Sequence, residues 1–132
     1  MTLIDSNILL DVLTNDPAWA DWSLQRLDAA ALKGTIAIND IVYAELSVGF
    51  DEIERLELFL ARTDILVAAM PRAALFLAGR IFQRYRARGG KRTSVLPDFF
   101  IGAHAAVAGV SLLSRDPGRY RSYFPSVDLI TP

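Results

Sequence analysis

The segment MTLIDSNILLDVL, residues 1–13, places an acidic residue directly after a very short apolar run. Thr2-Leu3-Ile4 has the composition of a short buried strand, and the apolar residues that follow Asn7 recur at helical spacing. Asp5 therefore lies where a strand gives way to a helix. Two interpretations are open: Asp5, Ser6 or Asn7 caps the helix, or Asp5 marks a functional site at the end of a strand.

The same alternation of strand and helix continues along the chain. Apolar runs bounded by turn residues predict further strands at residues 35–38, 65–67, 110–113 and 127–130. Apolar residues at helical spacing predict helices near residues 7–13, 19–32, 41–48, 51–62, 71–88 and 97–108, with a turn at residues 116–118. Strands that alternate with helices in this way predict an α/β sandwich with a mainly parallel sheet.

Composition limits the classes of protein to which the chain can belong. Its 132 residues suit one domain, and the absence of cysteine excludes disulfides and thiolate metal sites. The sequence has no uncharged apolar run long enough to span a membrane, and it lacks the basic start of a signal peptide. We therefore expect a single cytoplasmic domain over residues 1–132 with no membrane association.

Charge is unevenly distributed, although the formal net charge is only -1. Residues 1–64 contain twelve acidic and four basic residues, whereas residues 65–97 contain seven basic residues and no acidic one. This asymmetry suggests a locally positive surface that the net charge conceals. An ordinary solvated helix face is the alternative explanation.

Four acidic residues follow strands or lie in the helices that come after them. Asp5 follows the first strand, and Asp116 follows the strand at 110–113. Glu45 lies in the helix after the second strand, and Asp98 lies in the first turn of a later helix. Because sites in parallel sheets gather beyond the carboxyl ends of the strands, these four carboxylates could face one cavity.

Such a cluster requires a counter-charge. Two carboxylates about 4 Å apart repel each other by roughly 4 kcal/mol at an effective dielectric constant of about 20. Oxygen ligands without histidine or cysteine favour Mg²⁺ or Mn²⁺, which can activate water for attack on a phosphodiester.

Each acid also has an ordinary explanation. Asp5 fits a helix cap, and Asp98 fits the positive end of a helix dipole. Asp116 fits a turn, and Glu45 is a good helix former. Only the joint placement of the four acids favours a site. His104 is the only histidine, so catalysis by a Ser-His-Asp arrangement has little support.

Four segments resemble motifs of the PIN-domain family, and in particular of VapC-type toxins from prokaryotic toxin–antitoxin pairs. The segments are Ile4-Asp5-Ser6-Asn7, Tyr43-Ala44-Glu45-Leu46, residues 97–103, and Leu113-Ser114-Arg115-Asp116 with Arg119-Tyr120 and Phe124-Pro125 after it. The resemblance spans essentially the whole chain. It implies a three-layer α/β/α sandwich and an endoribonuclease that depends on Mg²⁺ or Mn²⁺.

The resemblance also implies which residues act. The residues expected to bind the metal and activate water are Asp5, Glu45, Asp98 and Asp116. The residues expected to support the acids or the water ligands are Ser6, Asn7 and Ser114. The basic residues that we expect to track the RNA backbone are Arg80, Arg84, Arg86, Arg88, Lys91 and Arg92.

The resemblance implies three partners: an RNA substrate, a VapB-type antitoxin and a second copy of the chain. The mean hydropathy of +0.28 is high for a small domain and suggests that a partner covers some apolar surface. Trp19, Trp22, Phe50, Leu58 and Phe59 suit a homodimer and a groove for an antitoxin helix, although burial in one core explains them equally well. Two other functions remain open: a non-catalytic binding module, and a metal-dependent nuclease for DNA or a phosphatase.

Overall fold

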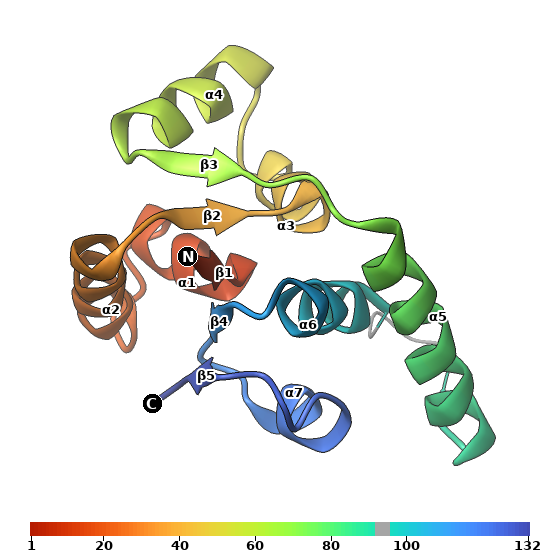
Figure 1. Ribbon diagram of the computed structural model, residues 1–132. Coiled ribbons are helices and arrows are strands. Elements are labelled where there is room, and N and C mark those ends of the chain that lie inside the picture. The colour runs from red at the N-terminus through yellow and green to blue at the C-terminus, as the bar shows by residue number, and fades with distance from the viewer. Residues whose placement is uncertain (92–95) are drawn as a thin grey trace.

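The computed structural model describes residues 1–91 and 96–132, and it has a five-stranded sheet flanked by helices (Figure 1). The strands are β1 (Thr2–Ile4), β2 (Ile36–Ile38), β3 (Ile65–Val67), β4 (Ser111–Leu113) and β5 (Leu129–Ile130). The helices are α1 (Ser6–Leu13), α2 (Ala20–Lys33), α3 (Asp40–Ser47), α4 (Ile53–Arg62), α5 (Arg72–Ala87), α6 (Leu96–Ala108) and α7 (Gly118–Tyr123). The predicted α/β/α sandwich is confirmed.

The sheet has the strand order β3-β2-β1-β4-β5, and each neighbouring pair is parallel. Figure 1 shows the strands in this order from top to bottom. β1 is the central strand, and Ile4 at its end is paired with Leu113 at the end of β4. Asp5 and Ser114, the residues that follow this pair, are therefore neighbours although they are 109 positions apart.

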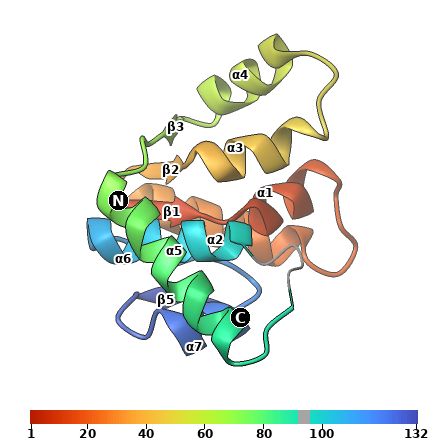
Figure 2. The same ribbon diagram turned by 90° about the vertical axis from the view of Figure 1, so that its right-hand side faces the viewer.

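Helices pack against the sheet and against one another. α1 contacts α2 and α3, and α5 lies along α6. Both views place α4 beside the edge strand β3 and α7 at the opposite edge beside β5 (Figure 2). The core joins these elements through apolar side chains that are at most 1% exposed, among them Leu3, Ile8, Phe99 and Leu112. Among the described helices, none combines the length and the apolar character that crossing a membrane requires.

Small residues let α7 approach α6 closely. Gly102 of α6 is buried, and a Cβ atom at this position would overlap the ring of Phe124, which follows α7. Phe124 is itself buried, and its ring lies 6.4 Å from that of Phe99. The contact fixes α7 against the helix whose first turn carries Asp98.

The structure resolves one open alternative and differs from the sequence predictions in a few details. Of the three candidate caps, Asp5 is the N-cap of α1: its backbone is extended, and its Oδ1 accepts a hydrogen bond from the Ser6 N–H at 2.8 Å. A short helix, α7, follows the turn predicted at residues 116–118. The last strand is limited to Leu129–Ile130, and α4 begins two residues later than predicted. The remaining boundaries agree within one residue.

Candidate active site

Asp5 lies at the centre of the candidate site because the central strand ends directly before it. The residue is only 4% exposed. Its Oδ2 accepts hydrogen bonds from Ser114 Oγ at 2.8 Å and from the Tyr120 hydroxyl at 2.9 Å, and Asn7 Nδ2 adds a longer one at 3.4 Å. Burial raises the pKa of the Asp5 carboxyl, and the hydrogen bonds from Ser114 and Tyr120 oppose this rise. The carboxylate is thus held in one orientation by fixed donors.

Glu45 reaches the site from α3, which begins at the end of β2. Asn39 caps this helix, because its Oδ1 accepts a hydrogen bond of 3.0 Å from a main-chain N–H of the first turn. The Ser6 hydroxyl donates to Glu45 Oε1 at 3.1 Å. Burial raises the pKa of the Glu45 carboxyl, the Ser6 hydrogen bond lowers it, and the charges of Asp5 and Asp98 raise it further. Glu45 therefore lies within the electrostatic field of the other acids.

Asp98 is half-buried in the first turn of α6 and is paired with Arg119 of α7. Arg119 Nη1 lies 2.8 Å from Asp98 Oδ2. Burial raises the pKa of the Asp98 carboxyl, the hydrogen bond and charge of Arg119 lower it, and Asp116 raises it. Arg119 thus supplies positive charge to a group of carboxylates that would otherwise repel one another.

Asp116 lies in the loop after β4, and its side chain is exposed. Its N–H donates to Ser114 Oγ at 3.1 Å, and Ser114 Oγ is the same atom that donates to Asp5. Asn7 braces this loop, because its Nδ2 donates to Ser114 Oγ and its Oδ1 accepts from the Arg115 N–H, both at 3.3 Å. The three small polar residues predicted to support the acids all contact an acid or this loop.

The acids come from four elements at one end of the sheet. Asp5 is linked to Glu45 through Ser6 and to the backbone of Asp116 through Ser114. The remaining acid, on α6, raises the pKa of Asp5 by its charge. The structure therefore brings the sequence-predicted acids into one electrostatic group.

These side chains do not form a closed metal cage. Within residues 1–91 and 96–132, no three acidic or histidine side chains are arranged so that they could hold a metal ion. Asp98 is instead engaged by Arg119. The donor types still fit Mg²⁺ or Mn²⁺, because they are carboxylate and hydroxyl oxygens without sulfur or imidazole.

Arg119 and Tyr120 contact the acids but were given no role in the sequence analysis. They lie in α7, three and four residues after Asp116, and the only sequence signal for them was their place in the family-like motif that follows Asp116. His104, the single histidine, is buried, and its Nδ1 lies 3.3 Å from Asn39 Nδ2. It packs beneath the cap of α3 and contacts none of the four acids in the described hydrogen bonds.

The family model of the PIN domain matches residues 2–124, which include the four acids and all their hydrogen-bond partners. The chain belongs to the PIN domain family. No curated protein matches it closely enough in sequence to count as a relative.

Solved structures share the fold of this PIN domain over almost its whole length. VapBC2 from Rickettsia felis, bound to a DNA fragment from its promoter, has a TM-score of 0.76 at 22% identity, over 99% of this chain and 98% of that one. DNA-bound VapBC from Salmonella typhimurium has a TM-score of 0.71 at 20% identity, over 98% and 96%. FitAcB from Neisseria gonorrhoeae has a TM-score of 0.65 at 20% identity, over 98% and 96%. At these identities the likeness establishes the shared fold.

Most of the basic residues predicted to contact RNA lie on or just after α5, which packs along α6 (Figure 1). Arg80, Arg84, Arg86 and Arg88 are exposed on this helix or at its end, and so is Lys91 just beyond it. Arg88 reaches toward α7, where its Cζ lies 5.8 Å from the ring centroid of Tyr123. Arg92, which was also predicted to contact RNA, lies outside the described residues.

The PIN domain also has an apolar pocket of about 180 Å³ away from the acids. Its lining comes from α1, α2, α4 and the two strands beside them, and it includes Leu9, Leu24, Leu27 and Phe59. Leu24 is 48% exposed, so this pocket is open to solvent on the α2 side. Of the five residues that the sequence analysis singled out for a partner surface, only Phe59 lines it.

Proposed function

We propose that this PIN domain is a metal-dependent endoribonuclease and the toxin of a toxin–antitoxin pair. The observation that carries the proposal is the group of four carboxylates of which Asp5 is the centre. Within this group the pKa values of Asp5, Glu45 and Asp98 are all raised. Raised pKa values in a cluster of acids are typical of sites that accept a cation or transfer a proton. Membership of the PIN domain family supports the same assignment.

The residues that would bind Mg²⁺ or Mn²⁺ are Asp5, Asp98, Asp116 and Glu45. When bound, such an ion supplies Lewis acidity toward the phosphate and the attacking water. Asp5 presents a carboxylate that Ser114 and Tyr120 already orient. Glu45, whose raised pKa suits a general base, would orient or deprotonate the water, or help to bind a second ion. Ser6 orients Glu45 for either task.

The exposed arginines of α5 would bind the RNA backbone. Contacts from arginine to phosphate increase affinity without reading sequence, and they weaken as salt rises. Arg84→Glu is therefore expected to weaken RNA binding at low salt and to reduce the dependence of binding on salt concentration. Arg55→Glu, on the exposed surface of α4, is the matched control. If both variants change RNA affinity equally, the α5 arginines form an ordinary solvated helix face and do not bind RNA specifically.

A toxin of this kind acts in the cytoplasm, where its RNA substrate and its antitoxin are found. The solved VapBC and FitAcB structures with this fold support a cognate antitoxin as the partner. The apolar pocket between α2 and α4 would receive an apolar segment of that antitoxin. We also expect the toxin to form a homodimer, which analytical ultracentrifugation of the isolated chain would test.

Cleavage of a structured RNA tests the proposal directly. Wild-type protein is incubated with RNA and Mg²⁺, with and without EDTA, beside the variants Asp5→Asn and Asp98→Asn. We expect EDTA and either substitution to abolish cleavage. Cleavage that persists in both variants would remove the acids from the active site. A parallel DNA substrate separates a ribonuclease from a general metal-dependent nuclease.

A non-catalytic binding module is the second candidate. The observation that favours it is that no three acids in the described residues are arranged to hold a metal ion. Such a module would bind RNA or the antitoxin without cleaving RNA under any metal condition. Calorimetric titration of Mn²⁺ into the protein distinguishes the two functions without relying on a chosen RNA.

A further inference from the structure

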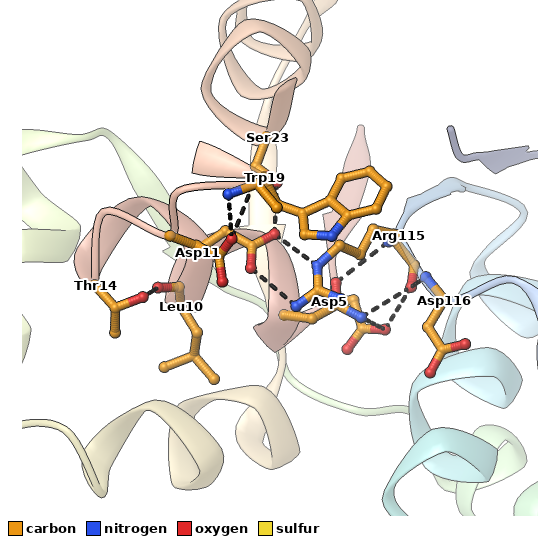
Figure 3. Close-up of polar contacts among 12 residues, drawn as sticks. Asp5, Leu10, Asp11, Thr14, Trp19, Ser23, Arg115 and Asp116 are labelled. Atoms are coloured by element: carbon orange, nitrogen blue, oxygen red, sulfur yellow. Dashed lines mark hydrogen bonds and ion pairs between the residues drawn. The ribbon is translucent and has the colours of Figure 1, made fainter. Parts of the chain in front are cut away.

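Arg115 lies between two residues of the candidate site, Ser114 and Asp116, but its side chain turns away from both. Figure 3 shows its guanidinium group directed toward Asp11 of α1, whereas the Asp116 carboxylate points in another direction. Arg115 Nε donates to Asp11 Oδ2 at 2.8 Å, and Nη2 donates to Oδ1 at 3.0 Å. Pairing through two nitrogen atoms fixes both the position and the direction of the guanidinium group.

The surroundings of Asp11 hold this arginine firmly. Asp11 is 3% exposed, and Ser23 Oγ of α2 donates to its Oδ2 at 2.8 Å. The indole of Trp19 covers the guanidinium group, with its ring centroid 5.4 Å from Arg115 Cζ. The main chain of Trp19 is anchored, because its backbone N–H donates to the carboxylate of Asp16 at 3.0 Å. Asp11 and Trp19 thus contact the guanidinium group directly, and Ser23 holds the Asp11 carboxylate in place.

A second carboxylate is within electrostatic reach of the same arginine. Asp11, Asp16 and Asp116 all raise the pKa of Arg115, Asp11 most strongly because it accepts the hydrogen bonds directly. Asp116 is the next residue in the chain and is exposed. Without Asp11, two carboxylates remain within electrostatic reach of this arginine: Asp16, whose Oδ1 already accepts from two main-chain N–H groups, and Asp116, a residue expected to bind the metal ion.

We propose that Asp11 is a positioning residue that holds Arg115 away from Asp116 and so leaves the Asp116 carboxylate free to bind a divalent cation. The inference rests on the proposed function, because it concerns the same metal site. In Asp11→Asn the arginine loses its anionic partner and turns to Asp116. There its guanidinium group competes with the cation for the carboxylate oxygens.

Titration of Mn²⁺ into the RNA-free full chain tests the inference. We expect Asp11→Asn to raise the Kd for Mn²⁺ by about tenfold, and the double variant Asp11→Asn/Arg115→Gln to bring it back to within about threefold of the wild-type value. A merely structural role predicts the reverse order, because the double variant loses more of the native contacts than the single one. Asp128→Asn is the matched control: it removes a carboxylate that accepts from Ser111 at the other end of β4, and no change is expected.

Thermal unfolding shows whether each variant is folded. If Asp11→Asn does not fold, Arg115→Lys replaces it, because lysine keeps the charge but loses the two-nitrogen pairing, and it should weaken Mn²⁺ binding in the same direction. Equal Kd values for the wild type and the folded single variant would overturn the inference and leave the proposed function intact. A double variant that binds no better than Asp11→Asn would also overturn it. The proposed function predicts that the wild-type protein binds Mn²⁺ and that Asp5→Asn does not. If neither protein binds Mn²⁺, both the proposed function and the inference are overturned.

Discussion

The hydroxyl of Tyr120 donates a hydrogen bond of 2.9 Å to Oδ2 of Asp5, and this bond joins α7 to the end of the central strand. Tyr120 is 2% exposed and Asp5 is 4% exposed, so water does not replace either partner. The bond lowers the pKa of Asp5 against the effect of burial. Burial, and then the charge of Asp5, raise the pKa of Tyr120, so the phenol remains a donor throughout the physiological range.

Tyr120→Phe should remove this donor while keeping the ring in place. The free energy of unfolding is expected to fall by about 1.5–3 kcal/mol, the range for a hydrogen bond to a charged group. The pKa of Asp5 should rise further, so the acid limb of the pH profile for RNA cleavage should move to higher pH. Urea unfolding and cleavage rates across pH measure the two effects.

Tyr43→Phe is the matched control for this prediction. The Tyr43 hydroxyl donates to Glu57 at 2.9 Å on the surface, where water can replace the lost bond. We expect it to change neither stability nor the pH profile. If both tyrosine variants behave alike, the buried hydroxyl has no special part in holding Asp5.

Arg119→Gln should make Mn²⁺ bind more tightly. The guanidinium group of Arg119 occupies Asp98 Oδ2, and a cation must displace it to use that oxygen. Asp98 and Arg119 are 31% and 39% exposed, and ion pairs at such positions contribute about 1 kcal/mol or less. The Kd for Mn²⁺ should therefore fall by about two- to fivefold.

Calorimetric titration with Mn²⁺ measures this change. Arg121→Gln serves as the control, because Arg121 lies on the same helix and its side chain bonds to Thr131, away from the acids. Tighter binding in both variants would indicate a general effect of net charge. Weaker binding in Arg119→Gln would mean that Arg119 supports the site and does not compete with the cation.

The order of the elements could be read from local patterns, because each strand is a short apolar run and each helix has its own periodicity. The rule that sites lie beyond the carboxyl ends of parallel strands then placed Asp5 near Asp116 without any knowledge of contacts. That prediction assumed that the ends of the two strands lie close together, and Ile4 at the end of β1 is indeed paired with Leu113 at the end of β4.

The details that local patterns left open or missed depend on partners far away in the sequence. Asp5, Ser6 and Asn7 were all possible caps, but the side chains of Ser6 and Asn7 are engaged by Glu45 and Ser114, and Asp5 caps α1. α7 is short and begins with glycine, so its helical preference is weak and packing against α6 supports it. No local pattern indicates that Arg115 pairs with an aspartate 104 positions before it.

The stability of the metal-free protein should decrease as the pH rises above the ordinary pKa of its buried acids. The pKa values of Asp5, Glu45 and Asp98 are raised in the folded state, so the folded protein holds these protons to higher pH than the unfolded chain does. Between the unfolded and the folded pKa the native state therefore binds more protons, and the free energy of unfolding falls as the pH rises.

Glu45→Gln removes one of these acids and keeps an acceptor for the Ser6 hydroxyl. In EDTA at neutral pH its midpoint of thermal unfolding should exceed that of the wild type by about 2 °C. The difference should disappear below pH 4.5, the ordinary pKa of the side chain, because the wild-type carboxyl is then protonated in both states. Scanning calorimetry across pH measures it, with Glu54→Gln on exposed α4 as the control. A variant less stable than the wild type at neutral pH would mean that Glu45 contributes favourably without a metal ion.

Two glycine-to-alanine changes should alter stability in opposite directions. In Gly102→Ala the new methyl group overlaps the buried ring of Phe124, and the strain should lower the free energy of unfolding by about 1–3 kcal/mol. Gly79 is an exposed residue of α5, and no atom lies within 4 Å of the Cβ that Gly79→Ala adds. The lower backbone entropy of the unfolded chain should therefore stabilise this variant by about 0.5–1 kcal/mol. Urea unfolding compares the stabilities of the two variants.

Because α7 carries Arg119 and Tyr120, Gly102→Ala should also reduce RNA cleavage when measured well below its unfolding transition, and Gly79→Ala should not. A stable and fully active Gly102→Ala protein would show that α7 does not need this close approach to α6 to organise the acids.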